Sequence, residues 1–124
     1  MPAEPLIAIV DDDESMRVGL VMLVRAAGYD ARGFASAEEF LALGPGALQS
    51  YACVITDIQM PGLTGIELKR RLSEGPHSPP VIMITAREEA GLEERALAAG
   101  AASFLRKPLD AATLLQRLDS ALKA

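Results

Sequence analysis

Short apolar runs, rich in β-branched residues, recur along the chain and predict β-strands. The three strongest runs are Leu6–Val10, Cys53–Thr56 and Val81–Thr85, and two weaker candidates are Asp30–Phe34 and Ser103–Leu105. The strong runs are apolar at nearly every position instead of at alternate positions. This continuous apolar character is typical of parallel strands that are buried on both faces of a sheet.

Between these runs, apolar residues recur at steps of three and four, which predicts amphipathic helices. The predicted helices are Met16–Ala26, Ala37–Leu43, Ile66–Leu72, Leu92–Ala98 and Leu109–Leu122. Ser36 precedes Glu39 by three residues, which is the pattern of a capping box, while Gly28 and Gly100 follow helical stretches as C-terminal caps. Five strands alternating with five helices predict one α/β domain over residues 1–124, a doubly wound parallel sheet with helices on both faces.

The composition narrows the function classes. Seventeen acidic and twelve basic residues give a net charge of −5, which argues against direct binding of nucleic acid. No apolar stretch approaches the roughly 18 residues of a spanning helix, and the N-terminus lacks the basic start of a signal peptide. The single cysteine, Cys53, lies in an apolar run and is expected to be buried and inert, so we expect a cytoplasmic protein. His77 lies among prolines and is expected to be solvated.

Polar residues follow the predicted strands at their carboxyl ends. Asp11, Asp12 and Asp13 follow the first strand, Asp57 follows Cys53–Thr56, Thr85 ends Val81–Thr85, and Lys107 follows Ser103–Leu105. In an open parallel sheet, these ends form the crevice in which ligands bind. Each residue alone has an ordinary explanation, since an acidic run after a strand is often only a helix N-cap. Their joint placement at one edge favours a functional site.

Several carboxylates at one edge repel one another unless a cation lies between them. Mg²⁺ suits such a site, because it prefers oxygen ligands and is often held by one or two carboxylates plus a phosphate. Lys107 could neutralise further charge and Thr85 could donate a hydrogen bond to a phosphoryl oxygen. These are components of phosphoryl transfer, in which an aspartate can act as the nucleophile.

The chain resembles the receiver domains of two-component signalling, in particular the branch with helix-turn-helix (LuxR-type) output domains. The resemblance covers nearly the whole sequence and implies the flavodoxin-like strand order 2-1-3-4-5. The matching segments are Val10-Asp11-Asp12, Thr56-Asp57-Ile58-Gln59-Met60-Pro61-Gly62, Gly65, Thr85-Ala86, Ala99-Gly100-Ala101 and Lys107-Pro108.

The resemblance implies a role for each residue at the sheet edge. Asp57 matches the phospho-acceptor, and Asp12 matches the residue that ligates Mg²⁺ directly. Asp11 matches the residue that holds a metal-bound water, and Gln59 supplies a backbone carbonyl as a further ligand. Asp13 lies just past the motif, so we interpret it as a helix-capping acid.

Three further residues match the switch of such domains. Thr85 matches the switch hydroxyl, Phe104 the switch aromatic residue, and Lys107 the lysine that pairs with the phosphoryl group. The resemblance also implies a cis peptide bond between Lys107 and Pro108, which would turn the chain and aim Lys107 into the crevice. We expect Phe104 to lean inward, because its ring carries no hydroxyl that would be left unpaired there.

The implied function is a signalling module that catalyses only its own phosphorylation and dephosphorylation and is not otherwise an enzyme. A sensor histidine kinase would be the donor, and the output, expected to be transcription, would reach DNA only through an output domain outside this chain. Phosphorylation would change the face formed by Leu92–Ala99, Ser103–Leu105 and Leu109–Leu122 and promote pairing with a partner or a second copy. No membrane partner is expected.

Two alternative functions remain open. The first is an Mg²⁺-dependent phosphohydrolase with an aspartyl-phosphate intermediate. Such enzymes commonly place a second acid two residues after the nucleophile, where this chain has Gln59. The second alternative, a receiver-like domain that is not phosphorylated, is disfavoured because Asp12, Asp57, Thr85 and Lys107 are all present.

Overall fold

The computed structural model describes residues 4–75 and 78–123 and contains one five-stranded, all-parallel sheet. Its strand order is β2-β1-β3-β4-β5, as the resemblance implies. The strands are β1 (Leu6–Val10), β2 (Asp30–Phe34), β3 (Cys53–Asp57), β4 (Val81–Thr85) and β5 (Ser103–Arg106). The predicted strands are therefore confirmed, with β3 and β5 each one residue longer than expected.

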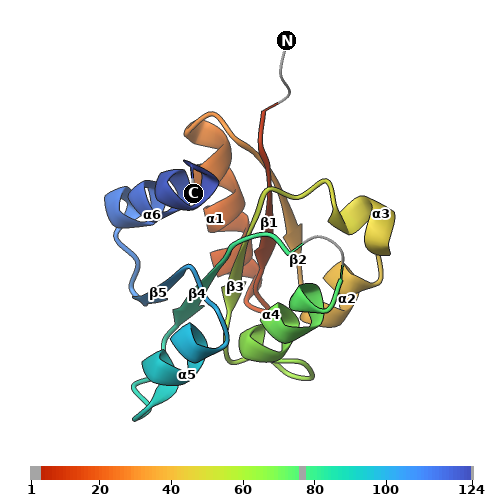
Figure 1. Ribbon diagram of the computed structural model, residues 1–124. Helices are drawn as coiled ribbons and strands as arrows, with labels where there is room; N and C mark the ends of the chain where they lie inside the picture. Colours follow the sequence, from red (N-terminus) through yellow and green to blue (C-terminus); the bar gives the residue numbers. More distant parts are fainter. Residues whose placement is uncertain (1–3, 76–77, 124) are drawn as a thin grey trace.

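Helices cover both faces of the sheet (Figure 1). The helices are α1 (Glu14–Ala26), α2 (Ala37–Leu41), α3 (Pro45–Leu48), α4 (Gly65–Ser73), α5 (Leu92–Ala98) and α6 (Ala111–Lys123). Side chains of α1 and α6 pack on one face, against the isoleucines of β1, β3 and β4. Side chains of α2, α4 and α5 pack on the other face. The doubly wound architecture predicted from the sequence is confirmed.

The central strands are buried on both sides, as their continuous apolar sequences indicated. Every residue of β3 and β4 is buried, including the polar residues Thr56, Asp57 and Thr85. Cys53 is fully buried, and this burial raises the pKa of its thiol to about 12. The expected burial of this cysteine is therefore confirmed, and a thiol with so high a pKa carries almost no thiolate at neutral pH, which supports the expectation that Cys53 is inert.

One helix was missed, and several predicted helix boundaries differ from the observed ones: α2 ends at Leu41 instead of Leu43, and α4 begins at Gly65, one residue before the predicted start. Five helices were expected, but the segment between β2 and β3 contains a second one, α3, which begins with Pro45 after Gly44 at φ 87°. Sequence reasoning missed it because its four residues bury no side chain, so no apolar period marks it. Helix α1 begins at Glu14, two residues before the predicted start, and α6 begins at Ala111, two residues after.

The helix caps follow the sequence signals only in part. Gly28 and Gly100 adopt φ of 101° and 102°, which confirms the left-handed caps. At α2, Ser36 accepts a hydrogen bond from the Glu39 amide, but the Glu39 carboxylate accepts from Ala35 and not from Ser36, so the predicted box is half formed. A complete capping box lies at α4.

The Lys107–Pro108 peptide bond is cis, as the resemblance implied. The expectation for His77 lies outside the described residues. Within the described part of the chain, no helix is both long and apolar enough to cross a membrane.

Gly65 holds the first turn of α4 against the end of β3. Its amide donates to the carbonyl of Ile58 at 3.0 Å, and a Cβ on it would lie 2.5 Å from the backbone oxygen of Asp57. Any other residue at this position would carry a Cβ that pushes the helix away from Asp57. Glycine therefore allows α4 to lie closer to the site. This contact fixes the distance between α4 and the strand that carries Asp57.

We therefore expect Gly65→Ala to lower the free energy of unfolding by about 1–3 kcal/mol, because backbone must move to admit the methyl group. Gly19→Ala is the control, since a Cβ on Gly19 in α1 meets nothing within 4 Å. That change should raise the free energy of unfolding by about 0.5–1 kcal/mol. Urea denaturation measures both values, and equal stability of Gly65→Ala and the wild type would contradict the prediction.

Candidate functional site

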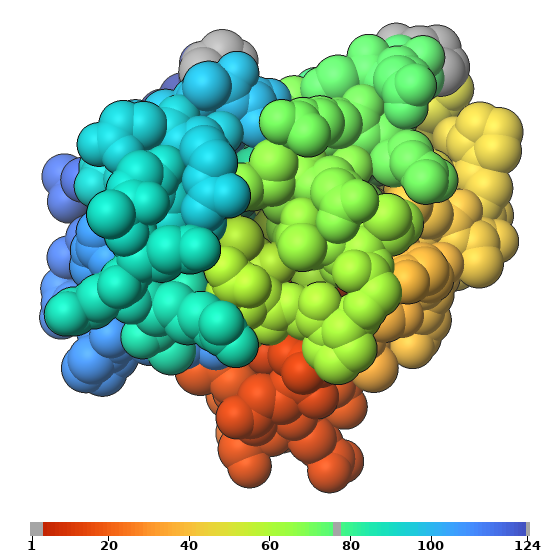
Figure 2. Space-filling model, turned by 90° about the horizontal axis from the view of Figure 1, so that it is seen from below, coloured from red at the N-terminus to blue at the C-terminus, as the bar shows by residue number. Residues whose placement is uncertain are grey.

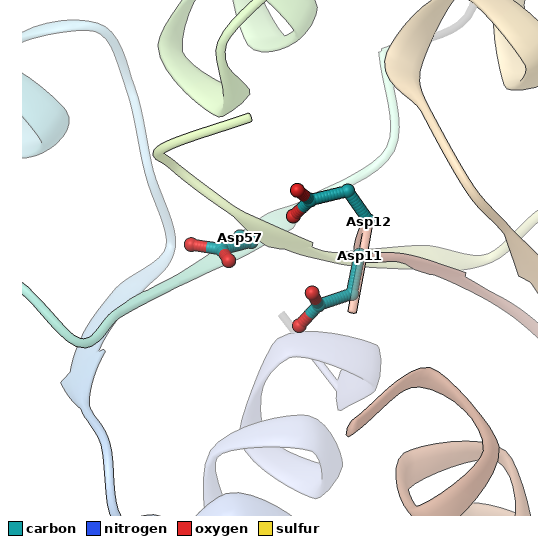
Figure 3. Close-up of side chains that lie close together, drawn as sticks. All are labelled: Asp11, Asp12 and Asp57. Atoms are coloured by element: carbon teal, nitrogen blue, oxygen red, sulfur yellow. The ribbon is translucent and has the colours of Figure 1, made fainter. Parts of the chain in front are cut away.

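The carboxyl ends of β1 and β3 bring three carboxylates together. Asp11 and Asp12 follow β1, Asp57 ends β3, and register pairs Val10 with Thr56. One carboxylate oxygen of each aspartate lies within 4.8 Å of the others, although Asp11 and Asp57 are 46 positions apart in the sequence. Figure 3 shows their carboxylates around a common space. Figure 2 looks onto this edge of the sheet, where the segments after β1, β3 and β4 converge.

Lys107 connects two of these carboxylates. Its Nζ atom lies 3.2 Å from Asp11 Oδ2 and 3.2 Å from Asp57 Oδ2. Its backbone amide donates to the carbonyl of Thr85 at 2.8 Å, which continues the pairing of β5 with β4 beyond the strand itself. The end of β5 thus places the ammonium group between the two aspartates. The sequence predicted that Lys107 lies in the crevice, but not that it bridges these two residues.

The electrostatics of the site follow from burial. Asp11 is fully buried and Asp57 is 7% exposed. Burial raises the pKa of Asp57; the Lys107 charge lowers it but does not cancel the effect, and Asp11 raises it further. Burial lowers the pKa of Lys107, but the charges of Asp57 and Asp11 outweigh this effect and raise it. The ionised form of the Asp57 carboxylate therefore lowers the free energy of unfolding.

The donor set fits a divalent cation. Among the residues that the structure describes, three carboxylates share the space with one ammonium group, which leaves two negative charges uncompensated. All the converging side-chain ligands are oxygens, and two of the three are buried, so their repulsion is poorly screened. Asp12 is exposed and open to water, which suits an ion that keeps part of its hydration shell.

Asp13 belongs to the helix and not to the acidic cluster of Asp11, Asp12 and Asp57. Its carboxylate accepts a hydrogen bond from the amide of Met16 at 3.2 Å, which makes it the N-cap of α1. The preferred interpretation of Asp13 as a capping acid is confirmed. Asp11 has a second local role, because its Oδ1 atom accepts from the amide of Asp13 at 3.0 Å.

The predicted switch residues lie on the neighbouring strands. Thr85 is fully buried, and its hydroxyl oxygen accepts a hydrogen bond from the amide of Arg87 at 3.0 Å. Phe104 is half-buried and packs against the α2–α4–α5 side of the core. The guanidinium carbon of Arg106 lies 5.2 Å from the centre of the Phe104 ring. Whether this ring turns inward on phosphorylation stays a prediction.

Gln59 lies at the start of the loop that joins β3 to α4. Its backbone amide donates to Asp57 Oδ1 at 3.3 Å, so each oxygen of the Asp57 carboxylate has a partner in addition to solvent. The role of its backbone carbonyl as a metal ligand stays a prediction.

Sequence reasoning missed Arg17. This side chain of α1 donates from Nη1 to the backbone carbonyl of Asp11 at 2.9 Å and fixes the chain between the two acidic residues. Gly33 on β2 makes room for it, since a Cβ there would lie 2.9 Å from Arg17 Cγ. An arginine one turn into a helix gives no local signal of such a contact.

Removal of Asp12 tests the cation site. We expect Asp12→Ala to abolish Mg²⁺ binding and, without Mg²⁺, to leave the fold as stable as the wild type or more so, because the change relieves repulsion among the acids. Asp13→Asn, which keeps an N-cap residue, should bind Mg²⁺ as the wild type does. Calorimetric titration with Mg²⁺ measures the binding, and an unchanged affinity of Asp12→Ala would contradict the assignment.

Comparison with known proteins gives one family. The family model of the response regulator receiver domain matches residues 7–119. Transcriptional regulatory protein FixJ of Bradyrhizobium diazoefficiens is 36% identical over 117 residues, covering 94% of this chain and 56% of that protein. Response regulator protein TmoT of Ectopseudomonas mendocina is 36% identical over 120 residues, covering 97% of this chain and 54% of that protein. The chain therefore spans about half the length of these curated relatives.

Solved structures agree in fold. A crystal structure described as FixJ-N has a TM-score of 0.88 at 29% identity, with 98% of this chain and 96% of that chain covered. A response regulator receiver protein from Burkholderia phymatum has a TM-score of 0.83 at 43% identity, with 97% and 96% covered. With a sheet order, a cluster of acids and a family match that all agree, the chain belongs to the response regulator receiver domains.

Proposed function

We propose that this chain, as one domain over residues 1–124, is the phospho-accepting module of a two-component system. Asp57 takes a phosphoryl group from a phosphohistidine of a sensor kinase in the presence of Mg²⁺. The observation that carries the proposal is the bridge from Lys107 to Asp57 and Asp11 beside the exposed Asp12. A nucleophile, a site for a cation and a fixed positive charge thus stand within one small space.

The chemistry is phosphoryl transfer to a carboxylate. An oxygen of Asp57 attacks phosphorus, the bond from phosphorus to the donor imidazole nitrogen breaks, and that nitrogen takes up a proton. Lys107 would follow the developing negative charge by pairing with a phosphoryl oxygen, and Thr85 would give up its contact with Arg87 to donate its hydroxyl. When bound, Mg²⁺ supplies charge neutralisation for the phosphoryl oxygens.

We assign the metal ligands by the same reasoning. Asp12 and Asp57 would bind Mg²⁺ directly, Gln59 through its backbone carbonyl, and Asp11 through a water. Asp11 suits the indirect role, because its carboxylate is already engaged by Lys107 and by the amide of Asp13. These few protein ligands fill only part of the coordination shell of Mg²⁺, and water fills the rest. We therefore expect weak binding of Mg²⁺.

The module catalyses only the phosphorylation and dephosphorylation of its own Asp57 and turns over no other substrate. A phosphohydrolase with an aspartyl nucleophile is not favoured, since the chain belongs to the receiver family and has Gln59 where a second acid would stand. Self-catalysed dephosphorylation remains part of the proposal, because water can attack the acyl phosphate at the same exposed edge.

We infer that the output is transcription, since the relatives are named as transcriptional and response regulators and this chain matches about half of each. DNA would be bound by an output domain outside these 124 residues. The net charge of −5 supports a domain that does not itself bind DNA. A cytoplasmic location belongs to the proposal, because both the kinase chemistry and the DNA are found there.

Incubation with acetyl phosphate and Mg²⁺, followed by intact-mass measurement, tests the proposed function. The expected result is the mass of one phosphoryl group, which should be absent when EDTA replaces Mg²⁺. Continuous release of phosphate at a rate typical of enzymes would indicate the hydrolase instead. No addition under any of these conditions would indicate a receiver fold without phosphorylation.

A second prediction concerns the proposed switch residues, Thr85 and Phe104. Phosphorylation should change the face formed by residues 92–99, 103–105 and 109–122, because Thr85 and Phe104 lie on strands that border it. Backbone amide NMR shifts with and without beryllofluoride, a phosphoryl mimic, measure the change. We expect shifts throughout residues 92–105, with a second copy of the chain or a partner bound more tightly. Shifts confined to the neighbourhood of Asp57 would contradict this mechanism.

A further inference from the structure

Glu38, in the first turn of α2, contacts the loop that follows Asp57. Its Oε2 atom accepts a hydrogen bond from the backbone amide of Leu63 at 3.1 Å, across 25 positions of sequence. The same carboxylate occupies the space beside Gly62, where an added Cβ would overlap it. In Figure 2 the surface of α2 lies alongside that of this loop. Gly62 also adopts φ 78°, so this turn requires glycine both for its backbone and for the contact.

The loop, residues 58–64, carries Gln59 to the edge of the site. Its two ends are fixed by the fold, since Ile58 pairs with Ile84 at 2.9 Å and the Ile58 carbonyl accepts from Gly65 at 3.0 Å. Its outer part, Pro61 and Gly62, is exposed. Glu38 reaches this outer part from a different element, and so limits how far the loop can move away from the acidic cluster.

The neighbouring acid behaves differently. Glu39 also lies in the first turn of α2, where negative charge favours the helix dipole, and its carboxylate accepts at 3.4 Å from the amide of Ala35 within the same cap. Glu38 does not share this local contact and instead bonds to the loop. Both glutamates carry the same charge in the first turn of α2, and of the two only Glu38 bonds to Leu63 in the described structure.

We propose that Glu38 is a positioning residue for the phosphorylation site, which holds the loop so that the backbone of Gln59 meets the metal. The proposal rests on the proposed function of the site. Partners that orient a metal ligand without touching the metal typically change metal affinity by ten- to a hundredfold. Because Glu38 is exposed and acts through backbone, we expect the lower end, an Mg²⁺ affinity about tenfold weaker in Glu38→Ala.

Three variants test the proposal. Glu38→Ala should need about tenfold more Mg²⁺ for half-maximal phosphorylation by acetyl phosphate, while the rate at saturating Mg²⁺ stays near that of the wild type. Glu39→Ala, which removes the same charge from the same helix turn, should match the wild type. Glu38→Gln keeps an acceptor oxygen without the charge and should restore most of the affinity. Thermal unfolding of each variant checks that it is folded.

The outcomes separate the possibilities. If Glu38→Gln falls as far as Glu38→Ala, the carboxylate acts by its charge alone and the proposal is overturned. If Glu38→Ala and Glu39→Ala have equal Mg²⁺ dependence, the contact has no role and the proposal is overturned. Hydrogen exchange at the Leu63 amide reports the contact without Mg²⁺: exchange must quicken in Glu38→Ala but not in Glu39→Ala. A wild type that takes up no phosphoryl group would refute the proposed function, while the exchange result would still decide the contact.

Discussion

Replacing Asp57 with asparagine is expected to abolish phosphoryl incorporation from acetyl phosphate. Asparagine keeps the shape of the side chain and one acceptor oxygen, but its neutral amide cannot form an acyl phosphate. Intact mass should show no addition under conditions in which the wild type is fully modified. Asp13→Asn makes the same chemical change in the N-cap of α1 and should be phosphorylated as the wild type is.

The fold of Asp57→Asn should survive the change. Burial raises the pKa of Asp57, so the ionised carboxylate destabilises the folded state at any pH above that pKa. The penalty shrinks as the pH falls through the raised pKa, because the folded protein then takes up the proton first. At neutral pH without Mg²⁺, the neutral asparagine avoids the penalty, and urea denaturation should show a variant at least as stable as the wild type. Phosphoryl uptake by this variant at the wild-type rate would exclude Asp57 as the acceptor.

Of the substitutions proposed here, Lys107→Met should cause the largest loss in the free energy of unfolding when Mg²⁺ is absent. Methionine keeps much of the side-chain length but leaves Asp11 and Asp57 buried without their positive partner. Removal of one member of a buried ion pair costs about 3–5 kcal/mol, and we expect about 3 kcal/mol because the Lys107 side chain is 18% exposed. Urea denaturation in EDTA measures the loss, and saturating Mg²⁺ should restore part of it.

The pH dependence of this variant has a defined sign. Without the Lys107 charge, which lowers it, the pKa of Asp57 rises further above its ordinary value of 3.8. The deficit relative to the wild type is complete at neutral pH and should narrow as the pH falls through that pKa. Lys123→Met is the control, because Lys123 pairs with Asp119 on the exposed surface of α6 and should change stability little at any pH. Equal losses in the two variants would contradict the buried role of Lys107.

Sequence patterns predicted the centre of the sheet well, because β1, β3 and β4 are local apolar runs that end where polar or turn-forming residues begin. Every position of β3 and β4 is buried, so few polar residues interrupt their apolar sequences. Helix α3 and the starts of α1 and α6 were harder, since short helices and first turns bury little and leave no period. The complete capping box from Thr64 to Glu67 could have been read from its spacing.

The site could be predicted to the level of which residues meet, because the carboxyl ends of parallel strands share one edge. The contacts that hold these residues could not be predicted. Arg17 bonds to a backbone carbonyl and Glu38 to a backbone amide, and a backbone partner leaves no mark in the sequence. The same holds for the choice of Lys107 to bridge Asp11 and Asp57, which lie 96 and 50 positions away.

The placement of the aromatic rings decides how the protein can be observed by optical spectroscopy. Phe34, Phe40 and Tyr51 form one cluster beneath α2, with ring centres 5.0–6.0 Å apart, and the chain has no tryptophan. The near-ultraviolet circular dichroism of the protein will therefore come from this cluster, next to the edge strand β2, and from Tyr29 on the other face of the sheet. Events at β5 involve only the weakly absorbing ring of Phe104. A tryptophan introduced at Phe104 would give activation an emission signal of its own, because tryptophan can be excited at wavelengths that Tyr29 and Tyr51 do not absorb.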